Sequence, residues 1–262
     1  MVCLMTDAKI RLYVDQPLGA GQTVPLDRDQ AHYLFGVMRL SAGGGVLLFN
    51  GRDGEWLARV AEAGKRGGLL ECEAQTRPLR MPPDLWLLFA PIKKARTDFI
   101  VEKAAEMGAA RIVPVQTDFT NAERIRQDRL QAHAVEAAEQ CGGTYVPEVA
   151  DLIRLDRLLA DWPAGRQLMF CDEGFADGGQ VGGRSFGPSA LPGRDPAAPP
   201  RPWAILIGPE GGFSPAERAR LHGLPFAHPV SLGPRILRAD TAAVVALTLW
   251  QSTLGDWAQA AS

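Results

Sequence analysis

Apolar and polar residues alternate in short runs through the first part of the chain, and turn residues separate these runs. Ile10–Val14 has the pattern of a strand. Val46–Phe49 and Glu55–Val60 flank the turn Asn50–Gly54 and predict a β-hairpin. Leu69–Glu73 follows as a further strand. Residues 9–76 therefore predict a small β domain.

One stretch of this domain has helical spacing instead. Between residues 29 and 40 the apolar side chains recur every three or four positions, which predicts a short helix. His32 and Arg39 border that helix. We expect His32 to be a partly buried structural histidine rather than a catalytic one.

Three prolines interrupt the pattern at residues 77–84 and predict a boundary between a domain at residues 1–78 and another at residues 79–262. Beyond it, strand and helix patterns alternate, which predicts an α/β domain with a mostly parallel sheet. The expected strands are Leu85–Ala90, Ile112–Val115, Gln167–Cys171, Trp203–Ile207 and His228–Leu232. The expected helices are Thr97–Gly108, Leu130–Cys141, Leu155–Trp162, Ser214–His222 and Asp240–Trp257.

Two parts of this second domain stand apart from the alternation. Gly174–Pro202 is rich in Gly, Pro, Ser and Ala and carries too little apolar surface to offset its ordering entropy, which predicts an inserted mobile loop. The last helix is apolar on more than one face. That pattern fits a subunit interface and a fully buried core helix about equally well.

Composition limits the classes of function. The chain has 262 residues, 46% hydrophobic and 22% charged, which suffices for one large core or two modest ones. Its net charge of -2 argues against general coating of a polyanion, so nucleic-acid contacts must come from local clusters. One cationic cluster lies between residues 77 and 96. On composition alone, a solvated surface is favoured there over RNA binding.

The cysteines Cys3, Cys72, Cys141 and Cys171 form no CxxC pair, so neither a metal site nor a disulfide framework is predicted. They fit a reducing, cytoplasmic location. No stretch approaches the roughly twenty apolar residues of a membrane span. Asp7 follows the first apolar residues too closely for a secretory signal.

Two glycine- and proline-rich loops carry the candidate chemistry. Gly208–Gly212 and Gly233–Leu237 each follow a predicted buried strand, and their glycines allow backbone to approach a ligand closely. Ser214 and Glu217 form a capping box, so a helix N-terminus faces the first loop. Either loop alone is a weak signal. Because both leave strands of one predicted sheet, the two together could line one crevice.

Several familiar motifs are absent from the sequence. It has neither GxGxxG after its first strand nor GxxxxGK[ST], so the common dinucleotide and P-loop sites are unsupported. It also lacks HExxH and GxSxG. A metal centre or a serine hydrolase is therefore not predicted.

The two loops and their flanks carry a specific resemblance. Leu206–Phe213 together with Ser231–Ala242 closely resembles the SPOUT methyltransferases, specifically the ribosomal RNA small subunit methyltransferase E family. Further similarity lies in Glu102–Gly108, in Glu136–Gly142 and in His32–Arg39. The resemblance extends through nearly the whole chain.

This resemblance implies a fold and an activity. The expected fold is a small N-terminal PUA-like β-barrel domain and a C-terminal α/β SPOUT domain with a parallel sheet and a deep trefoil knot. The expected assembly is a homodimer, and the expected methyl donor is S-adenosylmethionine. The implied substrate is N3 of a specific uridine near the 3′ end of 16S rRNA, in the assembled small ribosomal subunit.

The resemblance also places the cofactor in the knot loops. The cofactor-binding residues that it implies are Phe170, Cys171, Glu173, Ile207, Gly208, Pro209, Glu210, Gly211, Gly212, Ser231, Leu232, Gly233, Arg235, Ile236, Leu237 and Thr241.

Arg238 is the first candidate for catalysis. A cation at the uracil oxygens would stabilise the anion that forms when N3 loses its proton. Arg238 could equally form a structural ion pair with Glu210 or Asp240. Glu210 is a second candidate, as proton acceptor, although beside a helix N-terminus a structural role is favoured for it.

Substrate positioning is assigned to cations that would contact phosphates rather than base edges. These RNA-binding candidates are Arg11, Arg39, Arg77, Arg80, Lys93, Lys94 and Arg96. Arg11 and Arg39 fit equally well as ordinary surface charges.

Two departures from the family pattern limit what can be transferred. Gly143 stands where the family usually has an arginine, and the Gly/Pro-rich insertion is longer than usual. Two alternatives stay open. One is a SPOUT enzyme that methylates another RNA position or a ribose hydroxyl, and the other is a non-catalytic ribosome-assembly factor.

Overall fold

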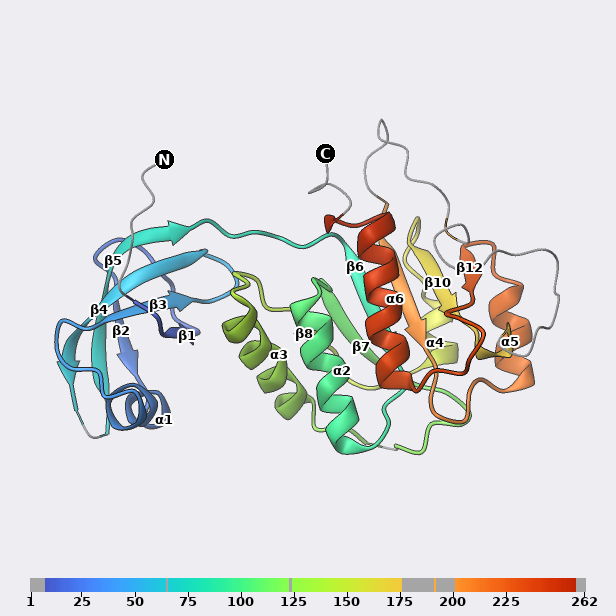
Figure 1. Cartoon of the computed structure of the whole chain (residues 1–262), viewed down its shortest axis with the longest axis horizontal. Helices are drawn as coiled ribbons and strands as arrows, with labels where there is room; N and C mark the ends of the chain where they lie inside the picture. The colour runs from blue at the N-terminus through green and yellow to red at the C-terminus, as the bar shows by residue number, and fades with distance from the viewer. Residues whose placement is uncertain (1–7, 65, 123, 176–190, 192–200, 258–262) are drawn as a thin grey trace. The chain divides into compact units, whose positions relative to one another are not determined.

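The computed structural model describes residues 8–64, 66–122, 124–175, 191 and 201–257. Its chain forms two compact units, drawn in Figure 1. Unit 1 comprises Met1–Met81 with Ala138–Val146, and unit 2 comprises Pro82–Ala137 with Pro147–Ser262. Unit 1 thus takes in a short segment that is distant in sequence, which the pattern of residues did not predict.

Unit 1 is built on a five-stranded sheet. Its strands are β1 (Arg11–Tyr13), β2 (Thr23–Leu26), β3 (Gly45–Phe49), β4 (Glu55–Ala63) and β5 (Gly68–Arg77), in the order β1-β3-β4-β5-β2. β1 pairs with β3 in parallel, and the other pairs are antiparallel. The predicted hairpin is confirmed as β3 and β4. Strand β2 was missed, since Pro25 interrupts its four residues and breaks the strand signal.

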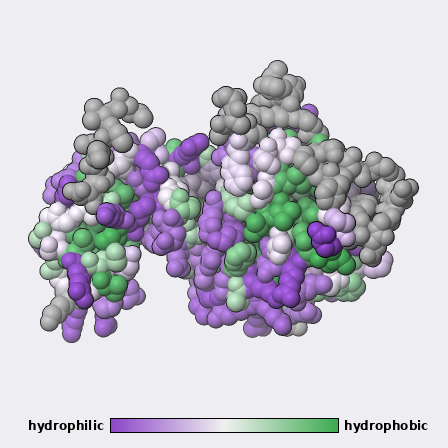
Figure 2. Space-filling view, in the orientation of Figure 1, coloured by the Kyte–Doolittle hydropathy of each residue, from purple (hydrophilic) through white to green (hydrophobic). Residues whose placement is uncertain are grey.

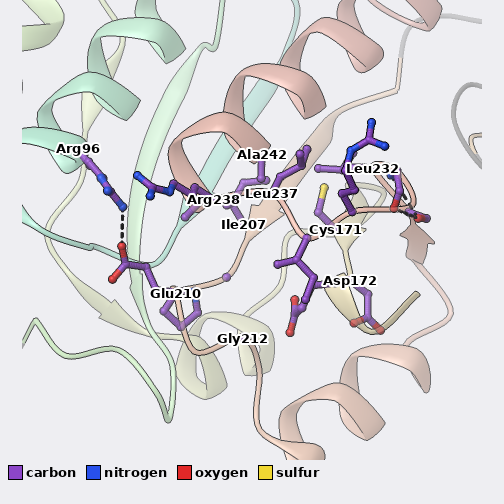
Figure 3. Close-up of a pocket in the computed structure, with 18 residues that line it drawn as sticks. Arg96, Cys171, Asp172, Ile207, Glu210, Gly212, Leu232, Leu237, Arg238 and Ala242 are labelled. Atoms are coloured by element: carbon purple, nitrogen blue, oxygen red, sulfur yellow. Dashed lines mark hydrogen bonds and ion pairs between the residues drawn. The ribbon is translucent and has the colours of Figure 1, made fainter. Parts of the chain in front are cut away.

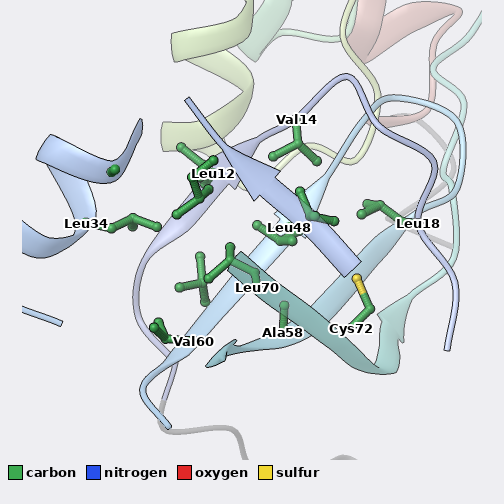
Figure 4. Close-up of a cluster of buried hydrophobic side chains, with 13 residues drawn as sticks. Leu12, Val14, Leu18, Leu34, Leu48, Ala58, Val60, Leu70 and Cys72 are labelled. Atoms are coloured by element: carbon green, nitrogen blue, oxygen red, sulfur yellow. The ribbon is translucent and has the colours of Figure 1, made fainter. Parts of the chain in front are cut away.

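Alternate side chains of this sheet form a buried core (Figure 4). Leu12, Leu48 and Leu70 are among its members, and each points to the same face of the sheet. The predicted helix at residues 29–40 consists of α1 (Arg28–Ala31) and a π-helix, η1 (His32–Val37). The expectation for His32 was wrong, because its side chain is exposed to solvent.

Unit 2 is an α/β domain with a parallel sheet, as expected. Its strands are β6 (Leu85–Phe89), β7 (Arg111–Gln116), β8 (Glu148–Val149), β9 (Ile153–Arg154), β10 (Gln167–Cys171), β11 (Trp203–Ile207) and β12 (Ala227–Val230). The order is β12-β10-β11-β6-β7-β8, β9 also pairs with β7, and every pairing is parallel.

The helices of unit 2 are α2 (Lys94–Glu106), α3 (Gln127–Cys141), α4 (Leu155–Ala160), α5 (Pro215–His222) and α6 (Ala239–Thr253), with a 3-10 turn η2 (Glu173–Phe175). The last turn of α3 belongs to unit 1. Figure 1 shows α2 and α6 side by side, and the two pack against each other.

Two helix boundaries differ from expectation. Helix α2 begins at Lys94 rather than Thr97, and the Thr97 hydroxyl lies inside the first turn, where it bonds both backbone groups of Ile92. Helix α6 ends at Thr253 rather than Trp257, because the amides of the next two residues both bond to the Trp250 carbonyl.

The strand order decides where a site can form. β10 lies between β11 and β12, with Phe170 in register with Leu206 and Cys171 in register with Val230. Since parallel strands end at one edge of a sheet, the segments after β10, β11 and β12 leave the sheet next to one another. Three loops distant in sequence therefore meet at this edge.

The predicted insertion, Gly174–Pro202, lies mostly outside the described residues, at 176–190 and 192–200. Among the residues that are described, no helix has the length and apolar character needed to cross a membrane.

Candidate functional site

A cavity of about 350 Å³ opens at the carboxyl edge of the unit 2 sheet (Figure 3). Its walls come from the segments that follow β10, β11 and β12, from the start of α6 and from Arg96 of α2. The residues that line it are Arg96, Cys171, Asp172, Glu173, Ile207, Gly208, Pro209, Glu210, Gly212, Ser231, Leu232, Gly233, Arg235, Ile236, Leu237, Arg238, Ala239 and Ala242. This volume falls within the ~300–1,000 Å³ typical of small-molecule sites.

Most of the residues predicted to bind the cofactor line this cavity, and three do not. Phe170 is fully buried in the core, edge-on to the Phe213 ring. Gly211 faces Phe119, and Thr241 is exposed on α6. The predicted loops thus line one cavity, but sequence reasoning did not resolve which residues of each loop point into it.

Besides Arg238, which was assigned to catalysis, four lining residues were absent from the predicted cofactor site: Arg96, Asp172, Ala239 and Ala242. Asp172 lies between two residues that were predicted, so its position directly after a buried strand was an available signal. Arg96 was assigned to RNA instead. Nothing in the local sequence indicates that α2 contributes to the cavity, because that proximity depends on the order of the strands.

Gly212 forms part of the cavity wall in a conformation that few other residues adopt. Its φ is 71°, and a Cβ at this position would overlap the Glu173 carboxylate. A residue with a side chain would therefore be strained in this backbone conformation, and its Cβ would also clash with Glu173. Glycine lets the two loops close on one another at the edge of the cavity.

The acidic side of the cavity is held by a network of hydrogen bonds. The buried Asp172 carboxylate accepts a bond from the Gly174 amide, lies 2.8 Å from Nε2 of His222 and pairs with Arg218 at 3.1 Å. Arg218 also bonds Glu173 at 3.0 Å. Both carboxylates therefore have fixed positions.

The Cys171 side chain forms an uncharged part of the cavity wall. Burial, together with the charges of Asp172 and Glu173, raises the pKa of its thiol well above the ordinary value. The thiol therefore stays protonated at neutral pH and is not a nucleophile. Within the part of the chain that the structure describes, no three His, Cys, Asp or Glu side chains are placed to hold a metal ion.

On the opposite side, Arg96 organises the charged groups. Its guanidinium lies 2.6 Å from the Glu210 carboxylate and 3.7 Å from that of Asp240. These are the two carboxylates that sequence reasoning offered as structural partners of Arg238. Figure 3 shows the Arg96–Glu210 pair and Arg238 on the same side of the cavity.

Arg238 itself is exposed and makes no side-chain hydrogen bond or ion pair with any residue that the structure describes. It occupies the N-cap position of α6 through its backbone. Three cations and three carboxylates line the cavity, so its charge is balanced. Such a site suits a small ligand that carries both charges and apolar surface.

The arginines predicted to bind RNA from unit 1 have different surroundings. The Arg11 side chain is only 12% exposed, bonds Glu55 at 2.8 Å and donates to the carbonyls of Ala138, Glu139 and Gly143. Arg77 also pairs with Glu55 and donates to the Gly142 carbonyl. These contacts give both side chains a structural role, and RNA binding by either stays a prediction.

The other predicted RNA residues are distributed over the two units. Arg39 is exposed in unit 1, with a φ of 56°, and Arg80 is exposed in the same unit. Lys93 and Lys94 are exposed at the start of α2 in unit 2. A role in RNA binding stays a prediction for these residues.

Comparison with known families gives two matches. The RNA methyltransferase domain family matches residues 80–251, and the RNA methyltransferase PUA domain family matches residues 26–71.

Several proteins are similar in sequence to this chain over most of its length. A ribosomal RNA small subunit methyltransferase E of Synechocystis is 31% identical over 86% of this chain and 71% of its own length. The protein of the same name from Rickettsia conorii is 28% identical over 90% of this chain and 93% of its own length.

Solved structures show the same fold. A methyltransferase from Legionella pneumophila with bound S-adenosylmethionine superposes with a TM-score of 0.79 at 27% identity, over 93% of this chain and 97% of the other. A ribosomal RNA small subunit methyltransferase E from Neisseria gonorrhoeae, also bound to S-adenosylmethionine, gives 0.77 at 26% identity, over 95% and 99%.

Proposed function

The chain belongs to the ribosomal RNA small subunit methyltransferase E family, and we propose that it transfers a methyl group from S-adenosylmethionine to N3 of one uridine of 16S rRNA. The observation that carries this proposal is the cavity formed by the loops after β10, β11 and β12. Its walls combine apolar side chains, glycine backbone and fixed charges of both signs.

The residues of the cavity fit this cofactor. Ile207, Leu237 and Ala242 supply apolar surface for an adenine ring. The fixed carboxylates of Asp172 and Glu173 can accept hydrogen bonds from hydroxyl or ammonium groups. When bound, S-adenosylmethionine supplies an electrophilic methyl group on a sulfonium centre.

Arg238 is the residue of the cavity best placed to act on the substrate. N3 of uracil carries a proton at neutral pH, so its nucleophilic form is an anion with charge on the ring oxygens. A guanidinium without a competing carboxylate partner can stabilise that charge as it develops. The free Arg238 side chain supports this role.

Glu210 is a weaker candidate for proton acceptor. Its carboxylate is already engaged by Arg96 at 2.6 Å, so it is not free to approach the N3 proton. We propose that Arg96 and Glu210 hold the rim of the cavity together. The loops would then orient N3 and the methyl group, and orientation supplies much of the rate.

The finer features of the fold are part of the same proposal. We infer a deep trefoil knot at the three loops, a homodimer, and a cytoplasmic enzyme whose PUA-like unit positions RNA. Val244 and Val245 of α6 are half-buried, and Figure 2 shows hydrophobic residues gathered over α6. Such a surface supports α6 as the subunit interface.

The proposal is tested with purified protein, S-adenosylmethionine labelled in its methyl group, and small ribosomal subunits from a strain that lacks the gene. The RNA is then digested to nucleosides and analysed by mass spectrometry. We expect N3-methyluridine as the labelled product. A ribose-methylated nucleoside would favour another SPOUT activity, and cofactor binding without any product would favour an assembly factor.

A further inference from the structure

A second cavity, of about 290 Å³, lies in unit 2 between the first turn of α2, the segment before α3 and the start of α3. Four of its lining residues are cations: Lys94, Arg124, Arg126 and Arg129. Asp98 is the acidic residue that lines it. The first turn of α2 adds the positive end of a helix dipole to this cavity.

A third cavity, of about 480 Å³, continues from the second. Arg124 and Ile125 line both, so the two cavities meet at this segment. Arg154 and Arg157 line the third cavity together with Asp151. The two cavities thus form one groove with six cationic residues and two acidic ones, in a chain whose net charge is -2.

Three of these cations are committed to carboxylates and three are not. Arg126 pairs with Asp128, Arg129 with Asp98 and Arg154 with Asp156. The side chains of Lys94, Arg124 and Arg157 are exposed and make no ion pair within the described part of the chain. Uncommitted cations at intervals along a groove are the arrangement that binds a phosphate backbone.

The loop that leads into this groove also contacts the loop after β11, other residues of which line the first cavity. Residues 117–122 follow β7, and Phe119 lies against Gly211 of the loop that precedes α5. The loop is anchored there, because Ser214 donates to the Asp118 carboxylate at 2.6 Å and the Asp118 amide donates to Glu217 at 2.9 Å.

Phe119 is 47% exposed in spite of these anchors. An aromatic ring that is held in place yet open to solvent can stack on a nucleotide base, which contributes about 1–3 kcal/mol per base. Phe119 contacts the loop after β11, which lines the first cavity, and the residues that follow it in the chain, Arg124 and Ile125, line the basic groove.

We propose that residues 117–122 and 124–126, between β7 and α3, form the RNA-positioning element of unit 2. Its groove holds the backbone phosphates of a single-stranded segment next to the target uridine, and Phe119 stacks on a neighbouring base. This inference rests on the proposed function and adds residues to it. Of the seven cations that the sequence indicated for RNA, Lys94 alone lines this groove.

The groove is tested by the salt dependence of RNA binding. The probe is a fluorescein-labelled single-stranded oligouridine of about twelve nucleotides, with the full-length protein and fluorescence anisotropy as the readout. Each phosphate contact in single strands contributes about 0.7 to the slope of log K against log salt. The double variant R124A/R157A should therefore lower the magnitude of this slope by about 1.4.

The control R59A/R201A makes the same change in net charge at two arginines that do not line the groove. Arg59 lies on β4, and Arg201 precedes β11, at the opposite edge of the unit 2 sheet. The control should keep the wild-type slope. An unchanged slope in R124A/R157A, or an equal loss in both double variants, would overturn the groove assignment.

Phe119 is tested by methyl transfer to small subunits. F119A should raise KM for the subunits about tenfold or more while S-adenosylmethionine affinity stays the same, and F119Y should restore KM. F99A, which removes another partly exposed ring, 39% exposed on α2, is the matched control and should leave KM unchanged. If F119A instead changed the oligomeric state by light scattering, Phe119 would be an interface residue and the stacking role would be wrong.

Failure of this inference is distinguishable from failure of the proposed function. Wild-type protein that methylates small subunits, together with groove variants that behave like wild type, would reject the groove alone. Wild-type protein that binds S-adenosylmethionine but neither binds the oligouridine nor methylates subunits would reject both.

Discussion

Arginine has opposite roles in the two units. In unit 1, Arg11 and Arg77 enclose the Glu55 carboxylate, whose side chain is 3% exposed, and give their remaining donors to backbone carbonyls. In unit 2, Arg238 lines the cavity at the ends of β10, β11 and β12, with no side-chain partner among the described residues. The first arrangement uses arginine to fix a fold, and the second leaves arginine available for a ligand.

This difference shows why a list of cations does not identify a binding site. Sequence reasoning treated Arg11 and Arg77 as RNA contacts and gave Arg238 an even chance of a structural ion pair. In the structure, Glu55 forms ion pairs with Arg11 and Arg77. Glu210 forms an ion pair with Arg96 rather than with Arg238. An arginine side chain is available to bind a ligand where the neighbouring carboxylates already form ion pairs with other residues.

The largest expected effect is on the stability of unit 1. Glu55→Ala leaves the buried Arg11 guanidinium without its carboxylate, and breaking a buried ion pair in this way costs about 3–5 kcal/mol. Chemical denaturation followed by circular dichroism should show the loss. The control Glu73→Ala breaks the exposed pair with Arg59, whose side chains are 43% and 47% exposed, and should cost no more than about 1 kcal/mol. Equal losses in the two variants would contradict the structural role of Glu55.

The second effect is on catalysis by unit 2. Arg238→Ala should lower kcat by about 10²–10³-fold, the usual cost of removing one group that stabilises a developing oxyanion. Isothermal titration should show S-adenosylmethionine affinity close to wild type, and stability should not change because the side chain is exposed. Arg235→Ala, at a neighbouring exposed arginine that was predicted to bind the cofactor, is the comparison and should lower affinity rather than kcat. Equal losses of turnover and affinity in Arg238→Ala would reassign it to cofactor binding.

The third effect is on cofactor binding. Gly212→Ala adds a Cβ that overlaps Glu173 at a φ of 71°, so S-adenosylmethionine affinity should fall about tenfold or more. Gly165→Ala is matched to it, because Gly165 has a φ of 80° but open space around its Cβ position. It should cost about 1 kcal/mol of stability and leave affinity unchanged. If both variants bound equally well, the close approach of the two loops would not matter for binding.

The smallest effect is a pH dependence of unit 1. Burial of the Glu55 carboxyl by itself raises its pKa, but hydrogen bonds from Arg77, Arg11 and Thr76 outweigh burial and hold the pKa below its ordinary value of 4.5. The folded state therefore gains stability from this group above pH 4.5, and that stability is lost as the pH falls through the folded pKa.

The difference in unfolding free energy between wild type and Glu55→Gln measures this contribution. It should be constant above about pH 5.5 and shrink as the pH falls below 4.5. A difference that stays constant down to pH 3, or one that grows on acidification, would reverse the assigned sign.

Local patterns predicted much of the fold because their causes are local. The alternation at Val46–Phe49 and Glu55–Val60 gave the hairpin, and the capping box of Ser214 and Glu217 placed the start of α5 within a residue. Alternating strands and helices indicated a parallel sheet, which the structure confirms. The two glycine loops were expected at strand ends, and the structure places them there.

Features that depend on contacts distant in sequence were not predictable in the same way. The Arg11 donors reach Ala138, 127 positions away, and Arg96 reaches Glu210, 114 positions away. The position of β10 between β11 and β12 is likewise set by packing rather than by any local pattern. Asp172 could have been found, since it follows the same strand as Cys171 and lies at the same edge of the sheet.

The central claim is that the cavity at the ends of β10, β11 and β12 serves methylation of one uridine in 16S rRNA. Reverse transcription of 16S rRNA from a deletion strain tests it most directly, because N3-methyluridine blocks base pairing and stops the enzyme. We predict that the stop disappears on deletion, returns with the wild-type gene and does not return with Arg238→Ala. A stop that persists in the deletion strain would contradict the account.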